Sequence, residues 1–414
     1  MKEVIYTEAM YNICCGLDIH KNIIVACLRL GRKEEIREFG TRTKDIKELV
    51  SWLKENDCEM VAMESTSVYW KPFVNIFEIE DVKYMVVNAR DFRHVPGRKT
   101  DIEDSRWLAQ LLIQGMLRAS YIPSREQREL REACRYRKKL TEERARGLNR
   151  LQKLLEGANI KLSSIVSDID GKTSLNLLDY VINNEDEIDE AKAKELIITR
   201  ISASVEKVVE AMDGIVTNFQ RLMLREVVAH IKELAVRVRT MDEIIAEYMA
   251  DYKELIDRLS KIPGIARRSA EIIISEIGVD MERFPTAGHL ASWAGVAPGN
   301  SESAGKRKNA KTKKSSKVLK STLAQSAQAA ARNKNSFYHA QHQRITVRRG
   351  KKRATIAVAH SILTSIYHMI KFNVEFEDLG SDYYNQFNTE KKAESYIRKL
   401  ENLGYEVVAV KKSA

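Results

Sequence analysis

The 414-residue chain has few cysteines. There are five, and no two of them form a Cys-x-x-Cys pair. They are Cys14, Cys15, Cys27, Cys58 and Cys134. All lie in or near apolar stretches, which argues against a disulfide framework and against cysteine-ligated zinc. We therefore expect reduced thiols and a cytosolic protein.

The chain also lacks a secretion signal and a long apolar run. Its N-terminus, Met1-Lys2-Glu3-Val4, carries charges where a signal peptide would need an apolar core. The longest apolar run, 354–370, contains two histidines and two serines and is too short and polar to span a bilayer. We expect no association with a membrane.

Acidic residues are absent from the segment 305–353, which contains sixteen Lys or Arg. The whole chain has 69 basic and 58 acidic residues and a net charge of +11; without this segment, 53 basic residues would face 58 acidic ones. The entire positive excess therefore lies in this basic segment, as is typical of a surface that binds a nucleic-acid backbone. A solvated lysine-rich surface or a localisation tail is the alternative interpretation.

The residues expected to contact nucleic acid are Lys306, Arg307, Lys308, Lys311, Lys313, Lys314, Lys317, Arg348, Arg349, Lys351, Lys352 and Arg353. Aromatic residues are sparse among them, with Phe337 and Tyr338 as the main examples. Reading of sequence by base stacking is therefore not indicated.

Length and composition predict a soluble, helix-rich protein of two or three domains, with 31% charged and 44% hydrophobic residues. Changes in pattern divide the chain into 1–123, 124–258, 259–380 and a C-terminal tail, 381–414. The tail has a helical pattern over 390–403 and a strand pattern over 405–410, and neither indicates a function.

The first part alternates strand and helix patterns. A strand ending in Asp18, a polar turn and a β-branched strand predict a hairpin. An amphipathic helix over 43–56, a strand ending in Glu64, a helix over 70–78 and a strand over 83–87 follow. A closing strand is expected over 119–122. The pattern favours an α/β domain, in which ligands gather at the carboxyl ends of parallel strands.

Four carboxylates predict a metal site in this domain. Asp101 and Asp104 are three residues apart on a predicted helix, so they share one face and repel each other unless a cation or solvent offsets the charge. Asp18 and Glu64 are placed at strand ends. One or two Mg²⁺ ions would suit this set. A solvated acidic first turn and, for Asp18, an Asx turn are the alternatives.

Two neighbours of these carboxylates are assigned no metal role. Glu103 points about 100° away from Asp104 on a helix, so we expect it to be a solvated bystander. His20 follows Asp18 in the hairpin turn. It could act as a base, but a surface turn histidine is the interpretation that we prefer.

Long charged helices are predicted over 124–258. Apolar residues alternate there in threes and fours, which is a heptad seam typical of a coiled coil. They are Leu224, Val227, Ile231, Leu234, Val238, Met241, Ile245, Tyr248, Tyr252, Leu255 and Leu259. The seam favours self-association, but the pattern leaves open whether it pairs within the chain or between chains.

The third part opens with a helix–hairpin–helix-like turn. Ile262-Pro263-Gly264-Ile265 interrupts a helical pattern, and turn amides of this kind can approach a phosphate. A helix capped by Phe284-Pro285-Thr286 runs to Trp293. A loop, 295–305, then leads into the basic segment.

In their order and combination, these motifs resemble the insertion-sequence transposases that have an N-terminal RuvC-like DEDD domain and a C-terminal transposase domain, some of them guided by a bridge RNA. The resemblance covers about 13–372. Its four acidic positions fall on Asp18, Glu64, Asp101 and Asp104. Its second signature resembles Ile262–Ile265 together with Leu290-Ala291-Ser292-Trp293-Ala294-Gly295-Val296-Ala297-Pro298.

The resemblance implies an α/β RNase H-like first domain, a helical coiled-coil middle and a mainly α C-terminal domain. It places the serine nucleophile at Ser303, although Ala304 separates Ser303 from Gly305 and leaves Ser301 as a lesser candidate. The implied reaction is Mg²⁺-dependent strand cleavage and exchange through a phosphoserine-DNA intermediate. Implied partners are DNA, a guide RNA and further copies of the chain in a dimer or tetramer. The implied location is the prokaryotic cytoplasm, with the nucleoid.

Three other functions are compatible with parts of this pattern. A junction resolvase would use the same carboxylates with water as the nucleophile. A catalytically inactive architectural protein would bind nucleic acid without a metal. An actin-like kinase shares Gly16-Leu17-Asp18, but no later glycine-rich adenosine loop is present, and the basic segment would be unexplained.

Overall fold

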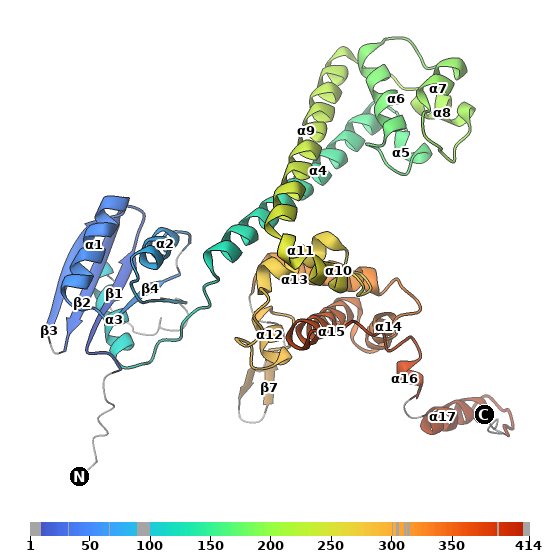
Figure 1. The fold of residues 1–414 in the computed structure, drawn as a ribbon. Coiled ribbons are helices and arrows are strands. Elements are labelled where there is room, and N and C mark those ends of the chain that lie inside the picture. The colour runs from blue at the N-terminus through green and yellow to red at the C-terminus, as the bar shows by residue number, and fades with distance from the viewer. Residues whose placement is uncertain are drawn as a thin grey trace. The chain divides into compact units, whose positions relative to one another are not determined.

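The computed structural model describes residues 10–31, 33–65, 67–88, 100–299, 301–303, 306–309, 312, 315–386 and 389–408. The chain divides into two compact units, Met1–Arg125 and Glu126–Ala414 (Figure 1). Within the described ranges, no helix is long and apolar enough to cross a membrane. All five cysteines are free thiols.

The first unit is built on a five-stranded mixed sheet in the order β3-β2-β1-β4-β5. The strands are β1 (Ile13–Ile19), β2 (Ile23–Leu30), β3 (Lys33–Gly40), β4 (Met60–Glu64) and β5 (Tyr84–Val87). β1, β2 and β3 pair antiparallel, whereas β1, β4 and β5 run parallel. The predicted hairpin and the parallel unit around a helix are confirmed.

Helices cover both faces of this sheet. They are α1 (Thr43–Glu55), α2 (Lys71–Ile79) and α3 (Asp101–Ile113). Because side chains alternate along a strand, Cys15 and Leu17 of β1 join a buried cluster with α1 and α2. Cys14 instead joins a cluster with Leu112 of α3. The even-numbered residues at the end of β1 therefore lie on the α3 face.

Gly16 is the point of closest approach between β1 and α3. A Cβ atom at Gly16 would lie 2.2 Å from the carbonyl oxygen of Ser105 and 2.6 Å from the amide nitrogen of Ala109. Both are backbone atoms, which cannot rotate away. Gly16 is therefore required for α3 to lie against the sheet.

We expect Gly16→Ala to lower the free energy of unfolding by ~1–3 kcal/mol or more, because the methyl group overpacks this contact and displaces α3. Denaturant unfolding measures the change. Gly157→Ala is the matched control, because a Cβ atom there meets nothing within 4 Å. Equal stability of both variants would contradict the close packing.

One strand of this unit was missed, and one predicted strand is wrong. β3 was not expected, because its sequence KEEIREFG is mostly charged. As the edge strand it pairs on one side only, with β2, and an edge position tolerates charged residues. The expected strand over 119–122 is reduced to one isolated bridge between Ala119 and Val87. A single bridge leaves most of that segment without a ladder partner.

The second unit begins with two long helices, α4 (Arg125–Gly157) and α9 (Asn218–Tyr248). Leu140 of α4 packs against Leu234 and Val238 of α9, and Gly147 lies beside Ile231. The predicted seam therefore pairs within the chain. It does not continue as one helix to 259, because a 3-10 helix, η1 (Ala250–Tyr252), separates α9 from α10 (Lys253–Leu259).

Four short helices connect α4 to α9 and were not predicted individually. They are α5 (Leu162–Ile165), α6 (Lys172–Asn183), α7 (Glu190–Leu196) and α8 (Val205–Met212). Their apolar residues share one buried cluster with the adjoining ends of the long helices.

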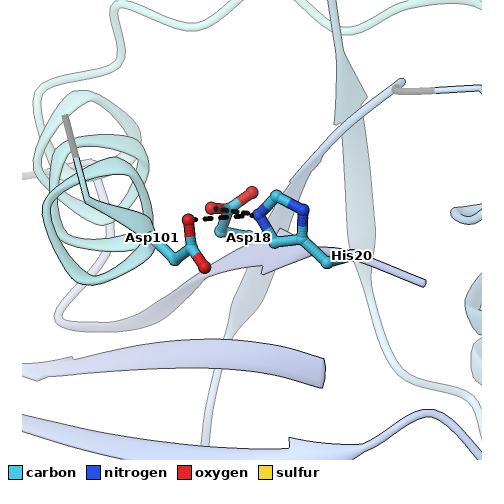
Figure 2. Close-up of side chains that lie close together, drawn as sticks. All are labelled: Asp18, His20 and Asp101. Carbon is cyan, nitrogen blue, oxygen red and sulfur yellow. Dashed lines mark hydrogen bonds and ion pairs between the residues drawn. The ribbon is translucent and has the colours of Figure 1, made fainter. Parts of the chain in front are cut away.

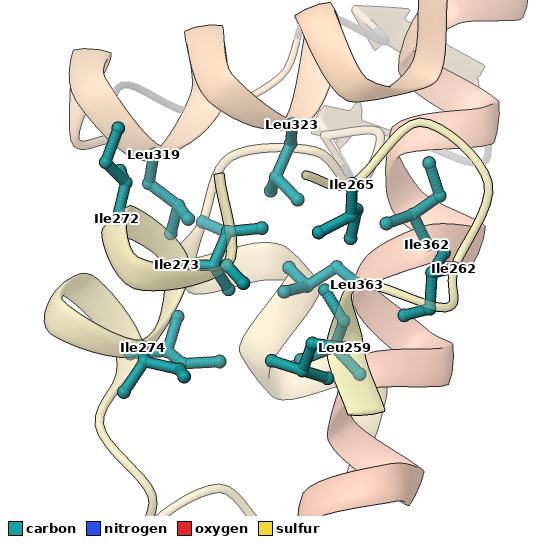
Figure 3. Packing of buried hydrophobic residues seen from close by; sticks show 14 of the residues in the cluster. Leu259, Ile262, Ile265, Ile272, Ile273, Ile274, Leu319, Leu323, Ile362 and Leu363 are labelled. Atoms are coloured by element: carbon teal, nitrogen blue, oxygen red, sulfur yellow. The ribbon is translucent and has the colours of Figure 1, made fainter. Parts of the chain in front are cut away.

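The remaining elements are the helices of the C-terminal core, a short hairpin and two helices near the C-terminus. They are α11 (Arg267–Ile277), α12 (Ala287–Trp293), β6 (Ser301–Ser303), β7 (Lys306–Asn309), α13 (Lys317–Ala330), α14 (Phe337–Arg349), α15 (Lys351–Phe372), α16 (Tyr383–Gln386) and α17 (Thr389–Glu401). The apolar run 354–370 supplies the buried face of α15, which shares one cluster with residues of α10, α11 and α13 (Figure 3).

The Pro-Gly turn of the second unit has a structural role. Gly264 has a φ of 83°, and a Cβ atom there would lie 2.2 Å from the carbonyl oxygen of Ser326 in α13, so the Pro-Gly turn packs against a helix of the same chain.

In the C-terminal tail, the predicted helix is present as α17. The expected strand is absent from 405–408, and its last two residues lie outside the described ranges.

Buried ion pairs join α4 to this core. The Arg137 guanidinium lies 2.9 Å from Asp242 of α9 and also contacts Glu271 of α11, where Arg137 and Glu271 are both 2% exposed. Arg135 of α4 holds Glu276, 2.7 Å away. Arg137 is almost fully buried, so loss of both of its carboxylate partners would leave a buried charge uncompensated.

Candidate catalytic site

The end of β1 and the start of α3 bring three side chains together (Figure 2). Asp18 follows Gly16 by two residues on the same strand face, and Asp101 precedes Ser105 by about one helical turn. The β1–β2 turn adds His20, whose Nε2 lies 3.2 Å from Asp18 Oδ2 and 3.3 Å from Asp101 Oδ1. One donor atom of each residue lies within 4.8 Å of the other two.

The three side chains differ in exposure. Asp18 is 8% exposed, whereas the side chains of His20 and Asp101 are about half exposed. Burial raises the pKa of Asp18, His20 opposes that shift, and the negative charges of Asp101 and Asp104 add to it. Asp18 therefore lies where a cation would be stabilised by the neighbouring carboxylates.

The other two predicted carboxylates lie on the same face. β1 and β4 are parallel with Leu17 opposite Met63, so Asp18 and Glu64 are the next residues at the same level. Leu17 and Met63 both face α1 and α2, so alternation turns Asp18 and Glu64 towards α3. Asp104 is close enough for its negative charge to raise the pKa of Asp18. An oxygen-rich set of this kind fits a divalent cation.

Local contacts hold α3 in place. Thr100 caps the helix by accepting a hydrogen bond from the amide of Glu103, 3.3 Å away. Arg106 lies 2.9 Å from Glu34 of β3 and also contacts Glu103. Glu103, the expected bystander, thus pairs with Arg106 on α3.

Ser303 lies in the second unit, on a short hairpin. β6 and β7 pair antiparallel, with Ser303 opposite Lys306 and Ser301 opposite Asn309. The expected loop is therefore partly a two-stranded ladder, and residues 304 and 305, between the two strands, lie outside the described residues. Ser303 is the last residue of β6, and Lys306 is the first of β7.

The basic residues fall into two groups. The first follows Ser303: Lys306, Arg307 and Lys308 are on β7, Lys317 begins α13, and Lys311, Lys313 and Lys314 lie outside the described residues. The second is the basic turn, which we define as Arg348, Arg349, Lys351, Lys352 and Arg353. These five residues are exposed around Gly350, where α14 ends and α15 begins.

Two family models match the chain in the regions that contain these features. A DEDD transposase model of IS110 type, described as "Transposase", matches residues 15–160. A second, described as "Transposase IS116/IS110/IS902 family", matches residues 256–343. The chain belongs to the IS110 transposase family. No curated protein is similar enough to be matched.

Membership of the IS110 family makes this chain a DNA-processing enzyme of the transposase type. The first matched region contains Asp18, Glu64, Asp101 and Asp104, and the second contains Ser303. The basic turn lies beyond the second region. The two matched regions follow the predicted order of a carboxylate domain and a serine-containing domain.

His20 of this IS110-family chain has contacts that its place in the sequence did not predict. The structure brings its imidazole between Asp18 and Asp101 instead of leaving it as an isolated turn histidine. The sequence contained part of the evidence, because Asp-x-His across a tight turn places both side chains at one end of a hairpin. It did not contain the contact with Asp101, which depends on how α3 packs.

Proposed function

We propose that this transposase is a recombinase of a mobile insertion sequence that cleaves and exchanges DNA strands with Mg²⁺ and a serine nucleophile. The observation that carries the proposal is the convergence of Asp18 and Asp101 within the DEDD-matched region. A RuvC-like fold for the first unit belongs to the same proposal. The mixed sheet, with its carboxylates at the ends of β1 and β4, supports it.

In this proposal, Asp18, Glu64, Asp101 and Asp104 hold one or two Mg²⁺ ions, which supply Lewis acidity at the scissile phosphate. Ser303 attacks phosphorus. A bond forms between its Oγ and phosphorus, the bond from phosphorus to the deoxyribose oxygen breaks, and that oxygen leaves as an alkoxide that takes up a proton. The serine proton passes to a base, because a neutral hydroxyl is a poor nucleophile.

The carboxylates and the serine belong to different compact units. We propose that they form one composite site during the reaction, with the serine from the same chain or from another protomer of a dimer or tetramer. The phosphoserine-DNA ester would conserve the energy of the broken linkage for strand exchange. A water nucleophile would release that energy instead.

Trapping the covalent intermediate tests this function. The full chain is incubated with DNA carrying the ends of its element, in Mg²⁺, and then denatured. A denaturant-resistant protein-DNA adduct whose labelled peptide contains 301–303 supports the proposal. Cleavage without any adduct would instead identify a water-dependent resolvase, and DNA binding with neither would identify an architectural protein.

We propose that the basic segment binds the phosphate backbone. Three cations of the basic turn occupy the first turn of α15, where they oppose the helix dipole. Among the described residues, no ion pair involves any of the five. The charges of Lys351, Lys352 and Arg353 therefore do not stabilise α15, and the positive charge of the basic turn is available to an external anion.

Replacing Arg349 and Lys352 by alanine should weaken nucleic-acid binding and lower the slope of log K against log salt by ~0.9 for each lost phosphate contact. Binding titrations over a range of salt concentrations measure both quantities. Lys207 and Lys253, exposed cations outside the basic segment, provide the matched double variant. An unchanged salt slope in Arg349→Ala/Lys352→Ala would show that the basic turn does not contact the backbone.

A guide RNA is part of the proposal, because contacts to the backbone do not by themselves read sequence. Nucleic acid that copurifies with the chain should include a discrete RNA encoded beside its gene. Sequencing of that RNA checks the expectation. Recovery of only random fragments would contradict a guide RNA and would mean that the protein itself recognises the target sequence.

A further inference from the structure

His20 adds a nitrogen donor to the carboxylates of Asp18 and Asp101, and one donor atom of each residue lies within 4.8 Å of the other two. The Nε2 of His20 lies 3.2 Å from an oxygen of Asp18 and 3.3 Å from an oxygen of Asp101. Two ligand atoms at adjacent corners of a shell with bonds of ~2.0–2.3 Å are about 3 Å apart. Small movements of these side chains would therefore let all three bind one ion.

The backbone already holds His20 in place for this role. The amide of His20 donates a hydrogen bond to the carbonyl oxygen of Ile23, 2.9 Å away, which closes the β1–β2 turn. Asp18 is held in the strand before that turn, and Asp101 in the first turn of α3. The three ligands would come from three separately fixed backbone positions, which favours a defined coordination geometry.

The imidazole changes which ion this position prefers. Mg²⁺ strongly prefers oxygen ligands and keeps much of its water, whereas divalent transition ions accept imidazole nitrogen readily. We propose that His20 is a third protein ligand beside Asp18 and Asp101, and that this position binds a divalent transition ion such as Mn²⁺ in preference to Mg²⁺. The inference rests on the metal-dependent function proposed above and names the ion for one position in it.

The alternative role of His20 is a hydrogen-bonding or ionic partner that only holds the two aspartates. The two roles differ in one observable. The nitrogen nucleus of a directly bound imidazole couples to the electron spin of Mn²⁺, whereas the nitrogen of an imidazole that only contacts the carboxylates does not show this ligand coupling. Binding affinity alone is weaker evidence, because an outer-shell partner also affects affinity.

The experiment uses the full chain without nucleic acid and with Mn²⁺ as the probe. Mn²⁺ affinity is measured from the electron paramagnetic resonance signal of the free ion, and pulsed spectra of the bound ion report nitrogen coupling. We expect imidazole nitrogen coupling in the wild type and its loss in His20→Gln and His20→Ala. Mn²⁺ affinity should fall by at least the ~10-fold that loss of even an outer-shell partner causes, whereas Mg²⁺ affinity should change little.

Glu103→Gln is the control, because Glu103 contacts Arg106 on the same helix. It should retain both nitrogen coupling and Mn²⁺ affinity. Thermal unfolding of each variant identifies any general loss of structure. If the His20 variants bound Mn²⁺ as tightly as the wild type, and the wild type showed no nitrogen coupling, the ligand role of His20 would be overturned. The carboxylate site would be unaffected by that result. No binding of Mn²⁺ or Mg²⁺ by the wild type would instead overturn the metal-dependent function itself.

Discussion

Replacing Ser303 by alanine should eliminate the covalent protein-DNA adduct and strand exchange, while DNA binding is retained. The substitution removes only the hydroxyl oxygen. Without Oγ, no atom at this position can form the ester with phosphorus. Denaturing gels with end-labelled DNA measure the adduct, and gel shifts measure binding.

Ser301→Ala is the matched control for Ser303→Ala. Both serines are on β6, and Ser301 lies opposite Asn309, at the end of the ladder away from the turn. We expect this variant to retain the adduct. If Ser301→Ala lost the adduct and Ser303→Ala kept it, the nucleophile would be Ser301. Recombination that persisted in both variants would rule out a nucleophile on this strand.

Asp101→Asn should reduce strand cleavage by ~10²–10³-fold or more, the range typical for loss of one group that stabilises transition-state charge. The amide has nearly the same shape as the carboxylate, so α3 should keep its position. It removes a negative charge beside Asp18, however, and therefore weakens the attraction for a divalent cation. Cleavage rates at saturating Mg²⁺ and isothermal titration with Mg²⁺ measure the two effects.

The matched control for Asp101→Asn is Glu103→Gln, which neutralises a carboxylate in the same helical turn. Glu103 pairs with Arg106 and Asp101 with His20, so only the second contact belongs to the candidate metal site. We expect Glu103→Gln to cleave at a rate close to that of the wild type. Equal losses in both variants would mean that α3 depends on its total charge and would contradict a specific metal role for Asp101.

Local patterns predicted much of the first unit. The strands ending near Asp18 and Glu64 and the helix starting at Asp101 were expected from alternation and spacing, and the structure has all three. The same rules missed β3, because its charges hide a strand that pairs with β2 at the sheet edge. They also predicted a strand at 119–122 that lacks a full partner. Strand formation depends on a neighbour, which no local pattern contains.

The second unit was predicted less completely for the same reason. The heptad seam of α9 was visible in the sequence, but its partner α4 was not assigned. The break at η1 was missed, because apolar spacing continues through it into α10. The hairpin that carries Ser303 was expected as a loop, since three- and four-residue strands have almost no periodic pattern. The roles of Ser303 and of the basic segment stay predictions.

The sequence by itself determined the family motifs, the location of the positive charge and the four candidate carboxylates, because strand ends, helical spacing and charge are local properties. Only the tertiary structure decided that α9 pairs with α4 and that His20 meets Asp101. Those contacts join residues far apart in the chain. They depend on close packing at points such as Gly16, where the absence of a side chain lets α3 approach the sheet and brings Asp101 to the end of β1.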